Sequence, residues 1–436
     1  MFARLTKSRF IRSAQTVASL ELPALILIAP ILLFPTPARL AVLAVVPVLW
    51  LSIRAAGGPM VPQTPMNVAL WLVLAMVGVS LFVTFDIDVS LGKVSGMILG
   101  ALLFWAVTRW LTDAARLRLG TAAFLLAGAG LSAFGLLGAN WDNKFPAIGA
   151  ITARLPGAIR GVPGAERGFS TNAVAGCLVL FIPLQIALLA AGGRWLAGSA
   201  PGGRRARVAV AETLLLILTT GTLILTESRT AWIGLAVAGA AFLLWHRRWT
   251  RVLAVAGAGA TAALLWILGE GSVLDMVVSR AGPAFLSTFA LRTKLWDIGI
   301  QGIRDFPLTG TGMNVFRKIM PTRYPGYPAL PGEEVAHVHN HLLQAALDLG
   351  IPGLIGYFSL WLLAGVLLVF VYRRADSSVY RAMASGLGAG LVAHFVFGMA
   401  DVIPLGSKVG VLFWLTLALV VGLHRVALGT PRRPVT

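Results

Sequence analysis

The sequence predicts an all-α fold, namely a polytopic integral membrane protein, and two observations carry this prediction. Only 12% of the 436 residues are charged, whereas 57% are hydrophobic and the mean hydropathy is +0.83; a soluble domain carries roughly twice that charged fraction. Apolar runs of about twenty residues recur along the whole chain, and each is long enough to cross a hydrocarbon core about 30 Å thick. Because a backbone in lipid is satisfied only in helices or closed barrels, runs of this length predict helices. We expect one integral membrane domain over residues 1–436.

Hydropathy predicts about twelve membrane-spanning helices. The chain begins with a basic segment that leads into the first span, and no small-x-small cleavage site follows, so we interpret this span as a retained helix rather than a signal peptide. Prolines interrupt the first pair of spans, and the tenth span is long enough to begin outside the bilayer. The predicted spans are residues 20–34, 38–53, 67–85, 94–108, 121–139, 171–191, 208–226, 230–245, 252–268, 341–372, 382–399 and 408–423.

Basic residues mark the connections that we expect on the cytoplasmic side. Arg and Lys residues precede the first span and follow the fourth, sixth, eighth, tenth and twelfth, so the positive-inside rule predicts that both termini are cytoplasmic. Two longer connections then face the periplasm: residues 140–170, and residues 269–340, the large periplasmic loop between helices 9 and 10. Topology and affinity for membrane lipids explain the net charge of +19, so it does not indicate nucleic acid. The single cysteine, Cys177, lies inside an apolar span, which excludes an internal disulfide.

Groups that could perform chemistry gather where the tenth span begins. His337, His339 and His341 fall within five residues, and Asn340 is a favourable helix-starting residue. A histidine titrates near neutral pH and suits the role of a general base. The alternative is that each histidine is a hydrogen-bonded structural residue. The spacing also resembles a metal site, but no carboxylate or cysteine partner is assured, so we expect no metal.

Both predicted periplasmic connections are basic, although orientation does not require these charges. Guanidinium groups bind phosphate oxygens bidentately and keep their charge, so the arginines indicate a phosphate site, with a solvated basic surface as the alternative. The run Thr309–Gly312 follows no strand and precedes no P-loop Lys–Ser pair, so we expect a tight turn rather than a nucleotide loop. His394 lies in an apolar span near Asp401, where polar groups are costly and often functional, but a packed structural histidine explains it equally well.

Four stretches, taken in order, resemble the O-antigen ligase family. The motifs that match are a Ser-Arg pair, Arg-x3-Trp, Pro-Leu-x-Gly-x-Gly, His-x-His-Asn-x-x-Leu-Gln and Leu-Gly-x-x-Gly. In this sequence they are Ser228–Arg229, Arg292 with Trp296, Pro307–Gly312, His337–Gln344 and Leu349–Gly353, and GFSTNAVAGCLVLFIPL at 168–184 accompanies them. The resemblance covers residues 209–372, which we define as the ligase-like core, and extends to the flanking spans by hydropathy alone.

The resemblance implies a GT-C-like glycosyltransferase of the bacterial inner membrane whose active site faces the periplasm. Members of the family transfer a glycan from undecaprenyl diphosphate to a sugar hydroxyl of lipid A–core, without a metal and without another cofactor, in a displacement that inverts the anomeric centre. The resemblance leaves open an O-antigen polymerase or a protein O-oligosaccharyltransferase of the same superfamily. A twelve-helix transporter is the alternative from a different class, but we see no internal repeat of the kind that transporters carry.

The resemblance also implies roles for individual residues. The catalytic residues are His337 or His339 as the base, with His337 preferred because it should lie on the loop before the helix, together with Arg229. The motifs imply Arg229 and Arg292 as diphosphate ligands, and Asn340, Gln344 and Trp296 as supporting residues. Outside the motifs, we expect Arg154 and Arg160 in the first periplasmic loop, and Lys93 at the outer end of a span, to bind the diphosphate as well. Each cation has a structural alternative: an ion pair of Arg229 with Glu227, cation–π packing of Arg292 on Trp296, and a snorkelling anchor for Lys93.

Overall fold

The structure is a computed structural model that describes residues 14–141, 145–159, 161, 168–192, 194–197, 202–246, 283–324 and 335–429. Within these residues the chain is almost entirely helical, and its only extended segments are the two-residue strands β1 (Ala139–Asn140) and β2 (Phe169–Ser170), which pair in parallel. The predicted all-α class is confirmed. The predicted GT-C-like fold stays a prediction.

Seven of the described helical segments are long and apolar enough to cross a membrane: Ile87–Trp110, Ala114–Gly138, Thr171–Ala190, Arg205–Leu225, His341–Arg374, Ser378–Ala400 and Lys408–Leu428. Three shorter apolar helices are Glu21–Leu33, Asn67–Val83 and Arg229–Leu243. The second predicted span is a 3-10 helix, η1 (Arg39–Ala44), that continues as α3 (Val45–Ala55), and the ninth, residues 252–268, lies outside the described residues. A total of twelve spans therefore remains a prediction.

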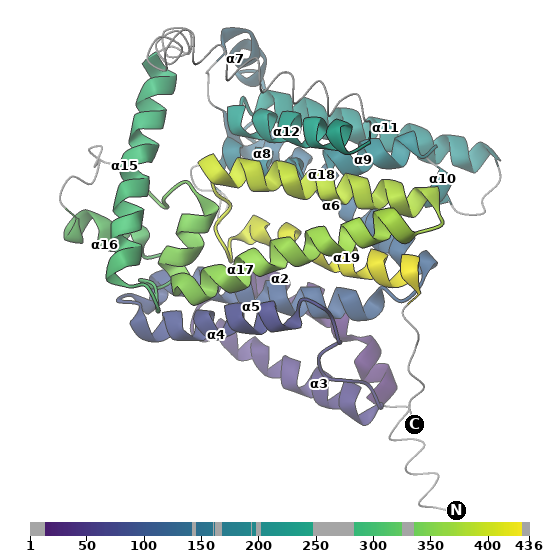
Figure 1. Cartoon of the computed structure of the whole chain (residues 1–436), viewed down its shortest axis with the longest axis horizontal. Helices are drawn as coiled ribbons and strands as arrows, with labels where there is room; N and C mark the ends of the chain where they lie inside the picture. Colours follow the sequence, from purple (N-terminus) through teal and green to yellow (C-terminus); the bar gives the residue numbers. More distant parts are fainter. Residues whose placement is uncertain are drawn as a thin grey trace, which may run out of the picture.

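Most helices lie side by side with roughly parallel axes (Figure 1). Their bounds are α2 (Glu21–Leu33), α4 (Asn67–Val83), α5 (Ile87–Trp110), α6 (Ala114–Gly138), α7 (Pro146–Thr152), α8 (Thr171–Leu178), α9 (Ile182–Ala190), α10 (Arg194–Ala197), α11 (Gly202–Leu225), α12 (Arg229–His246), α17 (His341–Arg374), α18 (Ser378–Ala400), η2 (Lys408–Gly410) and α19 (Val411–Leu428). Glycines permit close contact between them: a Cβ at Gly234 on α12 would overlap the backbone of Ala393 on α18, and a Cβ at Gly176 would overlap the Phe397 ring.

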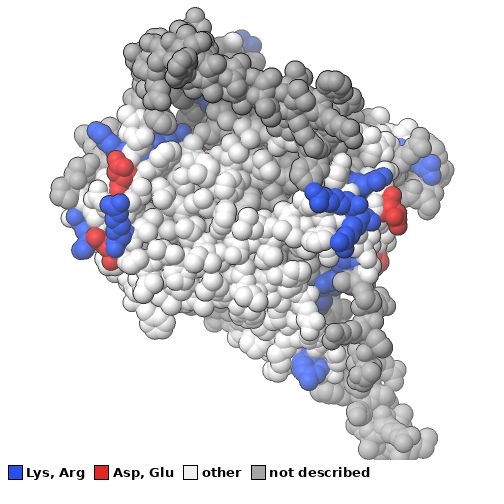
Figure 2. All heavy atoms as spheres, viewed as in Figure 1, with Lys and Arg blue, Asp and Glu red and all other residues white. Residues whose placement is uncertain are grey.

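On the face of the molecule shown in Figure 2, the charged side chains lie at the two ends of the bundle, with a broad uncharged band between them. We call one end the histidine end, because α17 begins there, and the other the arginine end, where α17 finishes at Arg373 and Arg374 and α18 begins. An uncharged band between two charged rims is what a protein in a bilayer requires, because charges in the hydrocarbon are costly.

Part of the predicted large loop, 269–340, is helical. α15 (Pro283–Asp305) stands across the histidine end of the bundle, and α16 (Phe316–Arg323) follows it (Figure 1). These helices share a second, small hydrophobic core with the chain that leads into α17, formed by Leu295, Ile298, Phe316, Met320, Tyr324, Val338 and Leu347. The core attaches the loop to the segment that carries the histidines.

The predicted tenth span is not one continuous helix. Gly350 has φ 70° and ψ 175°, so α17 consists of two helical segments, residues 341–349 and 351–374. Glycine alone adopts this conformation readily, and a Cβ at Gly350 would overlap the carbonyl of Leu308. The Thr311 N–H donates to the Leu347 carbonyl at 2.7 Å, and the Ile351 N–H donates to the Pro307 carbonyl at 2.7 Å. The segment 307–312, which contains the tight turn predicted at Thr309–Gly312, thus supplies backbone partners at the break.

Candidate functional site

A short loop, residues 335–340, carries two of the histidines to the start of α17, and we call it the histidine loop. Asn340 ends it as the N-cap of α17: its Oδ1 accepts hydrogen bonds from the N–H groups of Leu342 (3.0 Å) and Leu343 (3.1 Å). Its Nδ2 donates to the Met399 carbonyl at 3.1 Å, which ties the loop to the end of α18. The predicted helix-starting role of Asn340 is confirmed.

The side chain of Gln344, on α17, anchors the histidine loop. Its Oε1 accepts a hydrogen bond from the backbone N–H of Val338 at 3.0 Å, between the two histidines, and its Nε2 donates to Asp348 Oδ1 at 2.8 Å. Gln344 and Asp348 are both buried. Because the Val338 N–H can only donate, it orients the amide with Oε1 toward Val338 and Nε2 toward Asp348. The loop is therefore fixed at its centre and at its end.

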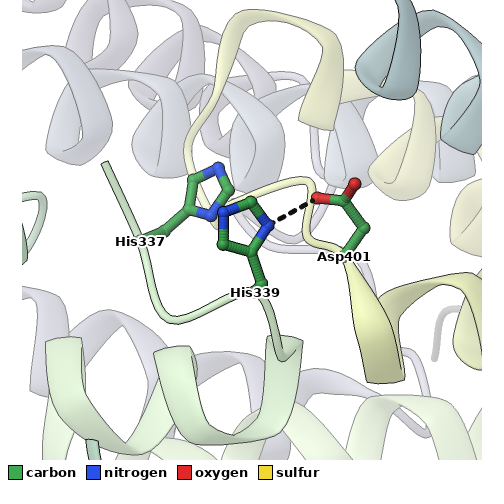
Figure 3. Close-up of side chains that lie close together, drawn as sticks. All are labelled: His337, His339 and Asp401. Atoms are coloured by element: carbon green, nitrogen blue, oxygen red, sulfur yellow. Dashed lines mark hydrogen bonds and ion pairs between the residues drawn. The ribbon is translucent and has the colours of Figure 1, made fainter. Parts of the chain in front are cut away.

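His339 pairs with Asp401 across the site (Figure 3). Its Nδ1 lies 3.2 Å from Asp401 Oδ1, and its side chain is 27% exposed, compared with 5% for that of Asp401. The Val402 N–H donates to the same oxygen at 2.8 Å, and Arg292 Nη2 lies 3.6 Å from Oδ2. Burial by itself raises the pKa of Asp401, but the hydrogen bond with His339 and the charges of the histidines and Arg292 outweigh it, so the pKa lies below its ordinary value.

This pairing sets the state of the His339 ring. An anionic Asp401 favours the tautomer in which Nδ1 carries the proton, which leaves the lone pair on Nε2. The backbone of His339 has φ 53°, a left-handed conformation that non-glycine residues rarely adopt. Strain of this kind persists only where surrounding contacts hold it, and the contacts here are those of Asn340, Gln344 and Asp401.

His337 lies beside His339, with ring centroids 4.4 Å apart. The pKa of His337 is lowered to about 3, mainly by desolvation and also by the charges of His339, Lys93 and Arg317, against the opposing effect of Asp401. His337 is therefore neutral at physiological pH. The ligand atoms of His337, His339 and Asp401 all lie within 4.8 Å of one another, a donor set that suits a transition metal. However, Arg292 contacts the carboxylate and two further cations line the cavity, and this positive charge opposes a divalent ion.

The histidine loop opens onto a cavity of about 300 Å³. Lys93 of α5 and Arg317 of α16 supply positive charge to its wall, and Asn172 contributes a polar group from the first turn of α8. Other polar lining residues include His337, His339, Gln344, Asp348 and Asp401. A cavity with a neutral base and two cations can bind an anionic substrate and remove a proton from it or from a neighbouring hydroxyl.

The structure brings some of the predicted residues to this cavity and places others elsewhere. His337, His339, Gln344 and Lys93 line it, and Arg292 approaches through Asp401. Among the described residues, the cavity lining does not include Arg229, Arg154 or Trp296. Trp296 packs against the second hydrophobic core, Arg154 is exposed after α7, and Arg160 lies outside the described residues.

Arg229 lies where α12 meets the 140–170 connection. Its guanidinium carbon is 5.4 Å from the centroid of the Phe145 ring, and that ring also stacks on Trp232, with the two ring centroids 5.6 Å apart. The Phe145 N–H also donates to the Glu227 carboxylate at 3.2 Å. In this conformation Arg229 helps to hold the connection against α12.

Sequence reasoning did not assign Asp401, Asp348 or Arg317 to the site. For Asp401 a signal was available, because an ionisable residue at the end of an apolar run usually faces the interior of a bundle. Two other histidines have structural partners: His341 Nδ1 lies 2.9 Å from the Tyr357 hydroxyl, and His394 Nδ1 lies 2.6 Å from the Gly176 carbonyl. The structural alternative therefore explains His341 and His394.

Residues 214–358 match the family model described as O-antigen ligase. No curated protein matches the chain. The matched segment contains Arg292, the segment 307–312, the histidine loop and the break at Gly350, whereas Lys93 and Asp401 lie outside it. Over this segment, about a third of the chain, the match supports the predicted resemblance to the O-antigen ligase family.

Proposed function

We propose that the protein is an O-antigen ligase of the bacterial inner membrane. It transfers the O-antigen glycan from undecaprenyl diphosphate to a sugar hydroxyl of lipid A–core at the periplasmic face. The observation that carries the proposal is the His339–Asp401 pair, which opens onto a cavity lined by Lys93 and Arg317. His339, His337 and Arg317 lie inside the family-matched segment.

His339 is the general base of the transfer. Its Nε2 takes the proton of the acceptor hydroxyl while that oxygen attacks the anomeric carbon of the donor glycan. A new glycosidic bond forms, the bond from the anomeric carbon to the diphosphate oxygen breaks, and undecaprenyl diphosphate leaves with the electron pair. Asp401 stabilises the imidazolium that results, and the single displacement inverts the anomeric centre.

The geometry supports His339 rather than His337 as this base. The carboxylate of Asp401 contacts the His339 ring directly, and His339 is the histidine with a defined acid partner. His337 Nδ1 is buried without a hydrogen-bond partner among the described residues, and desolvation lowers its pKa to about 3, so it is a weak base. His337 serves instead as a neutral polar wall of the cavity.

Lys93 and Arg317 stabilise the charge that develops on the departing diphosphate, because cations in a partly dehydrated cavity act strongly on nearby charge. Arg292 acts through Asp401, where it balances the carboxylate at 3.6 Å. Arg229 and Arg154 remain proposed diphosphate ligands at the 140–170 connection. For Arg229 to contact a phosphate, its guanidinium must leave the face of the Phe145 ring.

The test is transfer by the purified full chain in detergent containing EDTA, supplied with undecaprenyl-diphosphate glycan and lipid A–core. Wild type is expected to shift the acceptor to a ladder on a gel, and His339→Ala is expected to lose about 10²-fold or more of the rate, the usual contribution of a general base. His337→Ala is expected to lose less. If the acceptor never shifts while the lipid-linked glycan lengthens, the protein is a polymerase; if the glycan appears on a protein, it is an oligosaccharyltransferase.

The EDTA arm also tests the metal-independent mechanism. Activity that disappears with EDTA and returns with a divalent ion would assign the His337, His339 and Asp401 donor set to a metal. If the protein is instead a transporter, the lipid-linked glycan should move across a vesicle membrane and no new glycosidic bond should form.

A further inference from the structure

An apolar groove of about 470 Å³ runs between α12, α17 and α18, and two of its lining rings, Trp361 and Phe395, pack against His341 at the start of α17. The rings of Phe358, Trp361 and Phe395 line one end of it, and Tyr372 lines the other. These three helices lie next to one another on the face seen in Figure 1, and the Tyr372 end is the end at which α17 reaches Arg373 and Arg374. The groove therefore points toward the arginine end.

Small residues create the groove. Gly365 of α17 and Gly388 of α18 both line it. A Cβ added at Gly365 would meet no atom within 4 Å. In a membrane such a hollow is filled by hydrocarbon, because an empty one forfeits the dispersion contacts of its lining. Leu362, on the same wall, is 55% exposed, so the groove is open to the surrounding lipid.

Positive charge lies at the arginine end of the groove. Arg381 precedes the lining residues Ala384 and Ser385 by three and four positions on α18, and Arg373 follows the lining residue Val369 by four positions on α17. Residues at these spacings share a helix face, so both arginines continue the walls of the groove. Arg373, Arg374 and Arg381 are all exposed, and with Asp376 in the same connection the local formal charge is +2, three positive less one negative.

We propose that this groove binds an anionic phospholipid of the cytoplasmic leaflet, with one acyl chain along α17 and α18 and its phosphate at Arg373 and Arg381. The helix from Phe358 to Tyr372 rises about 21 Å, which accommodates a chain that must reach only about 15 Å to the bilayer midplane. The positive-inside rule explains arginines in this connection, but it does not explain an apolar groove that ends beneath them. The inference is independent of the transfer reaction.

The test uses the full chain, purified in a mild detergent and offered phosphatidylglycerol or phosphatidylcholine with identical acyl chains. Retained lipid is counted by native mass spectrometry. Wild type is expected to retain phosphatidylglycerol at least five-fold better than phosphatidylcholine. Gly365→Leu, which places a side chain in open space inside the groove, is expected to reduce retention of phosphatidylglycerol at least five-fold, whereas Gly365→Ala is the matched control and retains it.

A second variant tests whether Arg381 binds the phosphate of the lipid head group. Arg381→Gln leaves the groove open and is expected to bring retention of phosphatidylglycerol down to that of phosphatidylcholine. Equal retention of the two lipids by wild type would overturn the proposal. So would displacement of bound phosphatidylglycerol by undecaprenyl phosphate in stoichiometric amounts, because the groove would then belong to the donor's isoprenoid chain. If Gly365→Leu does not fold, the Arg381→Gln result decides.

Discussion

At the residue scale, the chemistry of the site depends on pairings that set the protonation of neighbouring histidines in different ways. His339 has a carboxylate at 3.2 Å, and His337, with its ring centroid 4.4 Å away, has lost its solvation and has no such direct pairing. One histidine is thereby given a defined tautomer while the other stays neutral. Two side chains of the same type, two positions apart, thus have different proposed roles.

Asp401→Asn tests the first of these pairings. The amide keeps the size of the carboxylate and can still accept from the Val402 N–H, but it removes the negative charge that stabilises an imidazolium. We expect the kcat of glycan transfer to fall about 10²-fold or more while KM changes little. Asp297→Asn, an exposed carboxylate on α15, is the control and keeps its rate. Full activity of Asp401→Asn would remove the pair from the mechanism.

The desolvated environment of His337 predicts that the stability of the fold depends on pH. Desolvation lowers the pKa of His337 from its ordinary value of 6.5 to about 3, so between these values the unfolded chain binds a proton that the folded chain does not. The free energy of unfolding must therefore fall as pH drops from about 6.5 toward 3. The pKa of Asp401, held below its ordinary value, acts in the same direction in more acidic solution.

The measurement is the unfolding temperature in detergent at a series of pH values. Wild type is expected to lose stability below pH 6.5 more steeply than His337→Asn, which cannot take up that proton. Parallel curves for the two proteins would show that His337 is as well solvated when folded as when unfolded.

At the element scale, the hydropathy pattern located helices well and their interruptions poorly. Residues 341–372 read as one span because apolar residues continue through Gly350, and no local feature distinguishes a helix break there from an ordinary helical glycine. The break depends on the segment 307–312, some forty residues away in sequence, whose carbonyl and N–H groups satisfy the freed backbone. Hydropathy reports burial in lipid but carries no information about which distant backbone groups meet.

Gly350→Ala tests the break directly. The residue is held at φ 70° and ψ 175°, a region that non-glycine residues enter at a cost of about 1–3 kcal/mol, and the new methyl group would also overlap the Leu308 carbonyl. We expect a clear fall in the unfolding temperature and a matching loss of transfer, because α17 positions the histidine loop. Gly365→Ala, in the same helix and in open space, is expected to be neutral or slightly stabilising. Equal stability of the two variants would argue against the break.

At the scale of the whole molecule, the sequence was sufficient for the class of protein and for part of the site. Low charge and repeated apolar runs led to the helical membrane fold. The family motifs led to His337, His339 and Gln344, and the position at the end of a span led to Lys93; all four line one cavity. Asp401 could not be found in this way, because it meets His339 only when α18 and α17 pack, 62 positions apart. Pairings between helices depend on packing, which a single sequence does not encode in any local pattern.

The orientation of the molecule follows from its charges and can be tested with thiols. Cys177 is the only cysteine in the chain and is buried, so Cys177→Ser is a suitable background for single exposed cysteines. Lys318→Cys lies on α16 at the histidine end, and Asp376→Cys lies between α17 and α18 at the arginine end; both positions are exposed. The positive-inside rule predicts that a membrane-impermeant maleimide labels Cys at 318 in intact spheroplasts and labels Cys at 376 only after the membrane is opened. The reverse pattern would place the histidine loop on the cytoplasmic side, where a periplasmic ligase cannot act, and would overturn the proposed function together with the proposed leaflet of the lipid groove.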